Sequence, residues 1–386
     1  MITRPPLWLL MCLACTGTLA MHMFVPALPA TGRDLGVGAA EVQLSIGIYV
    51  VTLGLGQLLY GPISDAVGRR PVAMTGVVVF VLGSLACAQA ASLGWLLAGR
   101  VLQAAGGAAG LTVARAAVRD AAGAGGSQKD IALLNLVMLI GPGVSPVLGA
   151  FLTVGLGWRA IFLTLALAAA VLFLFVFSRL PETVIHRVPF RPVRIWREQV
   201  ALASNPRFVA IATGGALAST QTYGYFAAAP YILTQELGVP PAQSGIYIGG
   251  ILAGAFLGAL SARLRVGRVS QNAFLFATSA LSVGVAALFV LLAVAGALSP
   301  ITLFGLTFLL MLSGGAISPT ALAASLDSEA ERAGAAAGFF GAAQMFAGAI
   351  CTALVGLWPQ QSISCAIMLL GASLTSFTLL WRGRRR

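Results

Sequence analysis

The chain has 386 residues, of which 59% are hydrophobic and only 9% are charged, and its formal net charge is +12. A soluble domain of this composition would expose more apolar surface than water tolerates. The composition therefore excludes an ordinary soluble protein. Because apolar stretches long enough to cross a bilayer recur along the whole chain, the sequence predicts an integral membrane protein.

We predict twelve membrane-spanning segments. Backbone polar groups in hydrocarbon must pair within their own segment, so each span is expected to be a helix. The predicted fold class is an all-α membrane protein with twelve transmembrane helices. The spans cover residues 7–29, 43–64, 72–91, 94–114, 131–155, 160–178, 208–233, 244–262, 273–297, 300–324, 333–357 and 362–381.

Basic residues are distributed unevenly between the two sides of these spans. With the N terminus in the cytoplasm, twenty of the 23 basic residues fall in cytoplasmic segments, Arg33 and Arg159 fall outside, and Arg100 lies within a span. This asymmetry follows the positive-inside rule, so we expect both termini in the cytoplasm. The positive charge then reports topology and contact with anionic lipid, and no nucleic-acid partner is expected.

Nothing in the sequence points to a catalytic or metal centre. The five cysteines all lie in apolar spans without metal-ligand spacing, so we interpret them as small core residues. No nucleotide-binding loop and no hydrolytic constellation of residues occurs in the sequence. We therefore predict neither an enzyme nor an ATP-driven pump, and no cofactor.

The Pro- and Arg-rich interval 181–207 separates six spans from six. We predict an N-terminal six-helix bundle at 1–180, a cytoplasmic linker at 181–207 and a C-terminal six-helix bundle at 208–386. Short repeats in the same order support two related halves, the architecture of transporters that rock around a midplane site. Asp34-Leu35-Gly36-Val37 is echoed by Glu236-Leu237-Gly238-Val239, and Gly47-Ile48-Tyr49 by Gly245-Ile246-Tyr247.

Glycines recur every four residues in two of the spans. Gly250, Gly254 and Gly258 share one helix face, and so do Gly106 and Gly110. This spacing predicts close approach between helix backbones. The close approach serves either relative movement of the helices or plain packing.

The segment from Gly61 to Pro71 joins two spans and places three charges in one short turn. Glycine permits a sharp bend, and a carboxylate beside arginines can hold neighbouring helix ends by charge and dipole. We predict a gating loop formed by Gly61, Asp65, Gly68, Arg69 and Arg70.

This loop resembles the Gly-x-Leu-x-Asp-x-x-Gly-Arg-Arg motif of the major facilitator superfamily, with Ile63 in place of leucine. Almost the whole chain resembles the twelve-span drug:proton antiporters of that family's Bcr/CflA (bicyclomycin/chloramphenicol resistance) branch. The resemblance implies two pseudo-symmetric bundles, a monomer and a bacterial inner-membrane location. It also implies that Asp65 and Arg69 belong to a charge network that holds the cytoplasmic side shut.

Two further segments resemble motifs of the same family. Arg100-Val101-Leu102-Gln103 is similar to the Arg-x-x-Gln-Gly motif, which implies a role in proton coupling for Arg100 and Gln103. Arg100 is the only Asp, Glu, Lys or Arg inside any predicted span, where a charge needs partners or water. Span 5 resembles the antiporter motif Gly-Pro-x-x-Gly-Gly, which implies export and a kink formed by Gly141, Pro142, Ser145, Pro146 and Gly149.

The sequence departs from the family pattern at His22, where the branch usually has an aspartate. All eleven acidic residues lie in loops or at helix ends. One hypothesis is that His22 takes over proton binding, because an imidazole titrates in the physiological range. The alternative is a structural histidine at a helix kink. A cavity without a carboxylate would also favour neutral, zwitterionic or weakly anionic amphipaths over permanent cations.

Aromatic and amide side chains within the spans are candidates for the lining of a substrate cavity, because a few polar groups in an apolar pocket orient a ligand. These candidates are Phe24, Tyr49, Gln57, Gln221, Tyr223, Phe226 and Gln344.

The sequence thus predicts a proton-coupled inner-membrane exporter of small amphipathic molecules that works by alternating access. Its expected partners are a small-molecule substrate, protons and membrane lipid. Export of an endogenous metabolite such as a siderophore is the main alternative. A channel, a membrane enzyme and a nutrient importer are the others.

Overall fold

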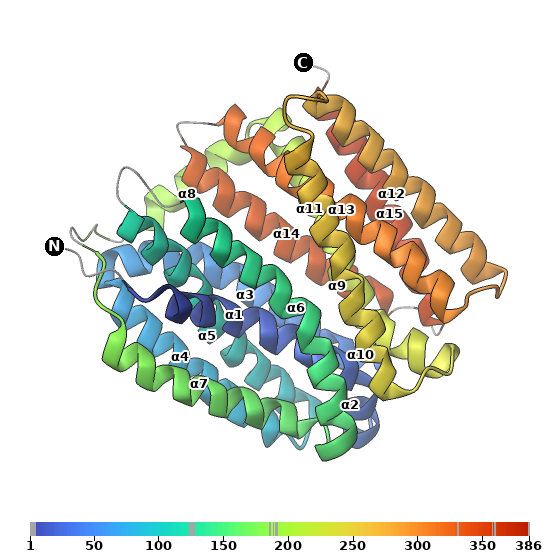
Figure 1. Cartoon of the computed structure of the whole chain (residues 1–386), viewed down its shortest axis with the longest axis horizontal. Helices are drawn as coiled ribbons and strands as arrows, with labels where there is room; N and C mark the ends of the chain where they lie inside the picture. Colours follow the sequence, from blue (N-terminus) through green and yellow to red (C-terminus); the bar gives the residue numbers. More distant parts are fainter. Residues whose placement is uncertain are drawn as a thin grey trace. The chain divides into compact units, whose positions relative to one another are not determined.

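The computed structural model describes residues 5–122, 128–184, 192–329, 332–356 and 360–384, together with residues 187, 189 and 358. These residues form helices and their connections, without a strand among them (Figure 1). The predicted all-α class is confirmed. Every predicted span overlaps at least one helix.

The first six predicted spans coincide with the helices up to residue 179. The first span is divided into α1, a short 3₁₀ segment η1 that contains Pro26, and α2, because proline lacks the N–H that a continuous helix would use. The elements are α1 Leu7–Phe24, η1 Val25–Ala27, α2 Leu28–Leu35, α3 Ala39–Val67, α4 Arg69–Ala88, α5 Leu93–Ala122, α6 Gln128–Leu156 and α7 Arg159–Arg179.

The remaining spans coincide with the helices from α9 onward, and α9 ends in a π-helical segment, η3. The elements are α8 Pro192–Ala203, α9 Pro206–Tyr231, η3 Ile232–Glu236, α10 Pro241–Gly250, α11 Leu252–Leu264, α12 Gln271–Val294, α13 Pro300–Ser328, α14 Ala333–Val355 and α15 Gln361–Arg384.

Ten helical segments among the described residues are long and apolar enough to cross a membrane. The two remaining predicted spans lie on α6 and α9, which are 29 and 26 residues long. Both exceed the roughly 20 residues that a bilayer requires. A multi-pass membrane protein is therefore established, and the full count of twelve spans stays a prediction.

The chain divides into two compact units, Met1–Phe190 and Arg191–Arg386, and the division falls inside the interval 181–207. This interval contains α8, a helix that the sequence analysis did not predict. Leu202 of α8 is fully buried in a cluster with Phe208 and Phe340 of the second unit. Gln199 Nε2 also donates a hydrogen bond of 3.3 Å to Ala335 O, so α8 is anchored on α9 and α14.

The repeated sequences place a glycine with the same φ at the end of the first span of each unit. Gly36 and Gly238 both have φ of +66°, in the left-handed region that favours glycine. Asp34, two residues before Gly36, accepts hydrogen bonds from Trp158 and Arg159 at the start of α7.

Glu236 holds the equivalent position in the second unit. Its Oε1 accepts a hydrogen bond of 3.2 Å from Ser362 N at the start of α15. In each unit, a carboxylate therefore ties the end of the first span to the start of the last one. This shared connection supports two structurally related halves.

The predicted close approach of helices at glycine is confirmed. A Cβ atom at Gly258 of α11 would lie 2.8 Å from Ala316 N of α13, and one at Gly106 of α5 would lie 2.5 Å from Gly76 O of α4. Real Cβ atoms do not approach backbone this closely, so the helix pairs depend on glycine here.

We predict that Gly258→Val destabilises the protein by more than about 2 kcal/mol, because the branched side chain would push α11 away from α13. Thermal unfolding of the purified protein in detergent measures this loss. Gly284→Val on α12 is the matched control, since a Cβ at Gly284 meets no atom within 4 Å. Equal unfolding temperatures for the two variants would contradict the packing explanation.

Candidate functional site

The predicted gating loop is shorter in the structure than the sequence suggests. α3 continues to Val67 and α4 begins at Arg69, so Gly61 and Asp65 lie in the last turns of α3 and Gly68 alone forms the connection. Gly68 has φ of +118°, which only glycine adopts without strain. A Cβ atom there would also lie 3.1 Å from Cδ of Glu182.

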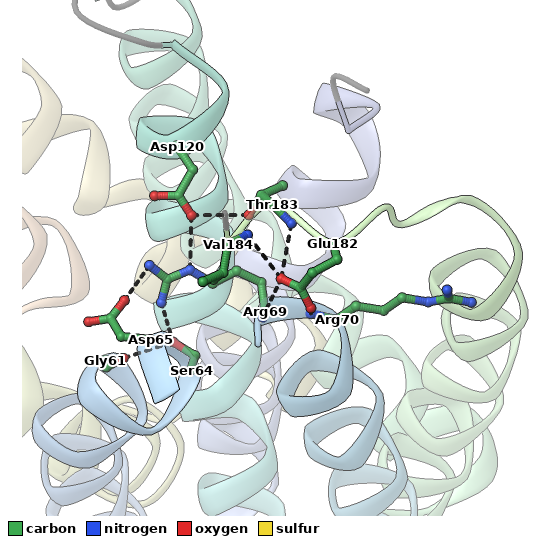
Figure 2. Close-up of polar contacts among 9 residues, drawn as sticks. All are labelled: Gly61, Ser64, Asp65, Arg69, Arg70, Asp120, Glu182, Thr183 and Val184. Carbon is green, nitrogen blue, oxygen red and sulfur yellow. Dashed lines mark hydrogen bonds and ion pairs between the residues drawn. The ribbon is translucent and has the colours of Figure 1, made fainter. Parts of the chain in front are cut away.

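Arg69 is the centre of a cluster of polar contacts at this connection (Figure 2). Its guanidinium forms an ion pair with Asp65, donates from Nε to Asp120 Oδ2 at 3.0 Å and donates from Nη1 to Ser64 Oγ at 2.5 Å. Arg69 is only 6% exposed. Because the cluster draws on α3, α4 and α5, it joins the ends of three helices.

Glu182 adds the segment that follows α7 to this cluster. Its Oε1 accepts hydrogen bonds from the backbone N–H groups of Arg69, Thr183 and Val184 at 2.8, 3.0 and 3.1 Å, and its Oε2 accepts one from Arg70 N at 3.2 Å. The first N–H groups of a helix have no partner within that helix. Glu182 therefore caps α4, and its negative charge opposes the positive end of the helix dipole.

Thr183 closes the same network on its other side. Its hydroxyl donates to Asp120 Oδ2 at 3.0 Å, the oxygen that also accepts from Arg69 Nε. Thr183 is 2% exposed although it lies outside any helix. The segment from Glu182 to Val184 is thus fixed on the connection between α3 and α4.

Arg70 points away from this network, as Figure 2 shows. Its Nη2 donates to Phe177 O at 2.7 Å, and its guanidinium lies 6.0 Å from the ring centroid of Phe177. Arg70 therefore holds the end of α7, a different role from that of Arg69.

The second unit repeats the Val-Gly-Arg sequence of this connection but not its charges, and its connection is longer, because α11 ends at Leu264 and α12 begins at Gln271. Val266-Gly267-Arg268 matches Val67-Gly68-Arg69, and Gly267 also has a positive φ, +78°. Leu264, however, stands where Asp65 would be. Arg268 forms no ion pair within the part of the chain that the structure describes. The charge cluster is a property of the first unit.

Arg100 lies in the interior of the first unit, where it is fully buried. Its Nη1 donates to Gln103 Oε1 at 2.7 Å and to Ala20 O at 3.3 Å, and its Nε donates to Ser45 O at 3.4 Å. Gln103 Nε2 in turn donates to Ser84 Oγ at 2.8 Å. The structure therefore brings Arg100 and Gln103 together, as their spacing on one helix implies.

Three aromatic rings surround the Arg100 guanidinium. Its carbon atom lies 3.9 Å from the ring centroid of Tyr49, 5.2 Å from that of Phe24 and 5.9 Å from that of Phe162. Aromatic faces attract cations, and more strongly where water is excluded. Among the residues described, no carboxylate pairs with Arg100, and its Nη2 has no hydrogen-bond acceptor.

His22 lies in the last turn of α1, and its Nδ1 is 2.6 Å from Thr18 O. Because a carbonyl oxygen only accepts, Nδ1 carries the hydrogen, and the lone pair of the neutral ring is on Nε2. Ala20 and Phe24, which both contact Arg100, lie four residues apart on one face of α1. His22, two residues from each, lies on another face, so an influence between His22 and Arg100 would pass through α1.

The antiporter-like segment is part of α6, which is helical from Gln128 to Leu156. Ser145, Pro146 and Gly149 are buried, Gly141 is half-buried, and the side chain of Pro142 lies outside the described residues. A Cβ atom at Gly149 would lie 3.2 Å from Met23 Cα, so α6 and α1 touch through backbone. The antiporter-like segment therefore packs against α1.

Several candidate cavity residues already make hydrogen bonds within their own units. Tyr49 donates to Gly17 O at 2.8 Å, and Gln221 donates to Ser373 Oγ at 2.8 Å and to Ser282 Oγ at 3.2 Å. Gln344 donates to Ser219 Oγ at 2.8 Å. Phe24, Tyr49, Gln221 and Phe226 are buried, whereas Gln57, Tyr223 and Gln344 are half-buried. A role in lining a cavity stays a prediction for all seven.

Comparison with known protein families agrees with these helices and motifs. The model of the Major Facilitator Superfamily matches residues 9–352. The chain belongs to this superfamily. A chloramphenicol resistance protein of Pseudomonas aeruginosa is 40% identical over 44% of this chain and 41% of its own length. Multidrug resistance protein MdtL of Salmonella typhimurium is 26% identical over 94% of this chain and 90% of its own length.

A solved structure shows the same superfamily fold. A bacterial homologue of the human lysosomal transporter Spinster superposes with a TM-score of 0.73 at 15% identity, covering 98% of this chain and 94% of that one. Together with the ten candidate spans, these similarities establish a multi-pass membrane transporter.

Four residues of the charge cluster were not predicted as site residues. These are Ser64, Asp120, Glu182 and Thr183. From the sequence, Asp120 was placed only among the acidic residues in loops or at helix ends. Glu182 lies 113 residues from Arg69, and no local pattern relates the two.

We predict that Glu182→Ala frays the start of α4, because it removes the acceptor of the Arg69 and Arg70 amides. The cost of losing a helix cap is about 1 kcal/mol. Hydrogen exchange read by mass spectrometry should show faster exchange in peptides covering 68–72. Glu182→Gln should have a smaller effect, since its remaining carbonyl oxygen still accepts from Arg69.

The matched control is Asp327→Ala, which removes an exposed carboxylate at the end of α13. Unchanged exchange at 68–72 in Glu182→Ala would contradict the capping role.

Proposed function

We propose that this protein exports small amphipathic molecules from a bacterial cell in exchange for protons, by alternating access between two six-helix halves. The observation that carries the proposal is the pair of charge systems in the first unit, a helix-end cluster at Arg69 and a buried guanidinium at Arg100. Membership of a transporter superfamily supports transport. The chloramphenicol and multidrug resistance relatives support drug efflux over export of a metabolite.

In this proposal, the Arg69 cluster is a gate at the cytoplasmic face. Arg69 contacts Asp65, Ser64 and Asp120, so movement of α3 relative to α5 would break or form several charged contacts together. Partly exposed ion pairs of this kind are individually weak. A weak cluster suits a gate that must open in every cycle.

Proton coupling is assigned to Arg100, Gln103 and His22. A proton would bind to the Nε2 atom of His22. The fixed positive charge of Arg100 opposes a second positive charge on α1. A substrate that binds near α1 and alters the surroundings of Arg100 would therefore change proton binding.

The chemistry of the site favours substrates without a permanent positive charge. No carboxylate faces Arg100 within the described residues, so no opposite charge there offsets the repulsion between Arg100 and a cationic substrate. Chloramphenicol is a neutral amphipath and fits this class. The proposed orientation places both termini in the cytoplasm of the inner membrane, with the protein acting as a monomer.

The proposal is tested by drug accumulation in cells. We expect an efflux-deficient bacterium that makes this protein to hold less labelled chloramphenicol than the same strain carrying Arg100→Met at equal protein abundance. A protonophore should remove the difference, because it collapses the proton gradient. Accumulation that is equal in both strains, or unaffected by the protonophore, would contradict proton-driven efflux.

The His22 hypothesis has its own test in vesicles that contain the purified protein. We predict that His22→Ala loses transport driven by a pH gradient but keeps exchange of labelled for unlabelled chloramphenicol, since exchange needs no net proton movement. His22→Gln, which retains a polar side chain, should behave like His22→Ala. Full pH-driven transport in both variants would show that His22 is a structural residue.

A further inference from the structure

The second unit contains a groove of about 340 Å³ between α14 and α15, with Leu217 of α9 at its base. The α14 wall consists of Ala347, Ile350, Cys351 and Leu354, which share one helix face. The α15 wall runs from Ser364 to Thr375 at the same helical spacing. Two parallel stripes on two helices therefore enclose an elongated recess.

The recess is open rather than filled by neighbouring side chains. A Cβ atom at Gly371, midway along the α15 wall, would meet no atom within 4 Å. At the rim, Ile350 is 60% exposed and Ile367 is 44% exposed. Small residues thus leave room at the centre while large apolar residues flank it.

The hydroxyl groups that line the groove are already engaged. Ser364 Oγ donates to Val355 O at 2.7 Å, and Thr375 Oγ1 donates to Gly371 O at 2.8 Å. A ligand that buried a polar group here would lose hydrogen bonds to water without replacement, which is costly. The groove therefore suits a hydrocarbon chain better than a drug with polar substituents.

The length of the groove matches one leaflet of a bilayer. The eleven residue steps from Ser364 to Thr375 rise about 16 Å along a helix. Half of a hydrocarbon core of about 30 Å is about 15 Å. Trp358, which is 54% exposed, lines the groove and lies in the connection between α14 and α15. Tryptophan is enriched at the level of lipid headgroups, so Trp358 marks the headgroup end.

We propose that this groove is a specific binding site for one acyl chain of a membrane phospholipid, whose headgroup lies beside Trp358. The acyl chain would contact three helices at once, whereas a lipid on a flat helix face contacts one or two. Such a lipid should stay bound when the surrounding bilayer is removed. In the predicted topology, the connection that contains Trp358 lies outside the cell membrane, so the lipid belongs to the outer leaflet. The site does not depend on the proposed transport function.

The test is lipid retention by the full-length protein. The protein is reconstituted into vesicles of phosphatidylethanolamine and phosphatidylglycerol at a ratio of about three to one, extracted into mild detergent and examined by native mass spectrometry. We expect wild type to retain one phospholipid. Gly371→Leu, which fills the centre of the groove, should lower the retained fraction at least tenfold.

Gly284→Leu is the matched control, because Gly284 also faces open space but lies on α12, away from the groove. Ala347→Phe fills the groove from α14 and guards against a folding defect peculiar to Gly371→Leu. Retention that is equal in wild type and both groove variants would overturn the proposal. Loss of lipid in Gly284→Leu to the same extent would also overturn it, since the site would then not be this groove.

Discussion

The buried guanidinium of Arg100, which pairs with no carboxylate among the described residues, is the constraint on which the first unit depends. Arg100 is fully buried, and its charge is met by two backbone carbonyls, one amide and three aromatic faces. This environment requires α1, α3 and α5 to pack closely. Gly17 and Gly107 permit that packing, because a Cβ atom at Gly107 would lie 2.6 Å from Gly17 Cα. Tyr49 then donates to Gly17 O and stacks on Arg100.

The two charge systems of the first unit lie on one helix. Arg100 and Asp120 both belong to α5, and twenty residues of α-helix span about 30 Å. Any displacement of α5 that alters the surroundings of Arg100 therefore also moves Asp120, which accepts from both Arg69 and Thr183. Since the segment after α7 is held by the same network, α5 connects the buried site to the Arg69 cluster and to that segment.

The sequence was a good guide to features that depend on residues close together in the chain. Apolar length predicted the spans, glycine spacing predicted the close helix pairs, and the i,i+3 spacing of Arg100 and Gln103 placed them together. Contacts between distant segments were not predictable. The cap that Glu182 provides for α4 depends on where α7 ends, and α8 is too short and too polar to stand out beside the spans. The groove at Gly371 is lined by residues of both α14 and α15, so the stripe on either helix alone does not reveal it.

The central claim is that solute and protons move in opposite directions through this protein. It is tested most directly in sealed vesicles that contain the purified chain and a pH-sensitive dye. When a chloramphenicol gradient is imposed at equal pH on both sides, we predict proton movement against the direction of drug flow, and none in Arg100→Met. Drug movement without any change in internal pH, or with protons moving in the same direction, would contradict the claim.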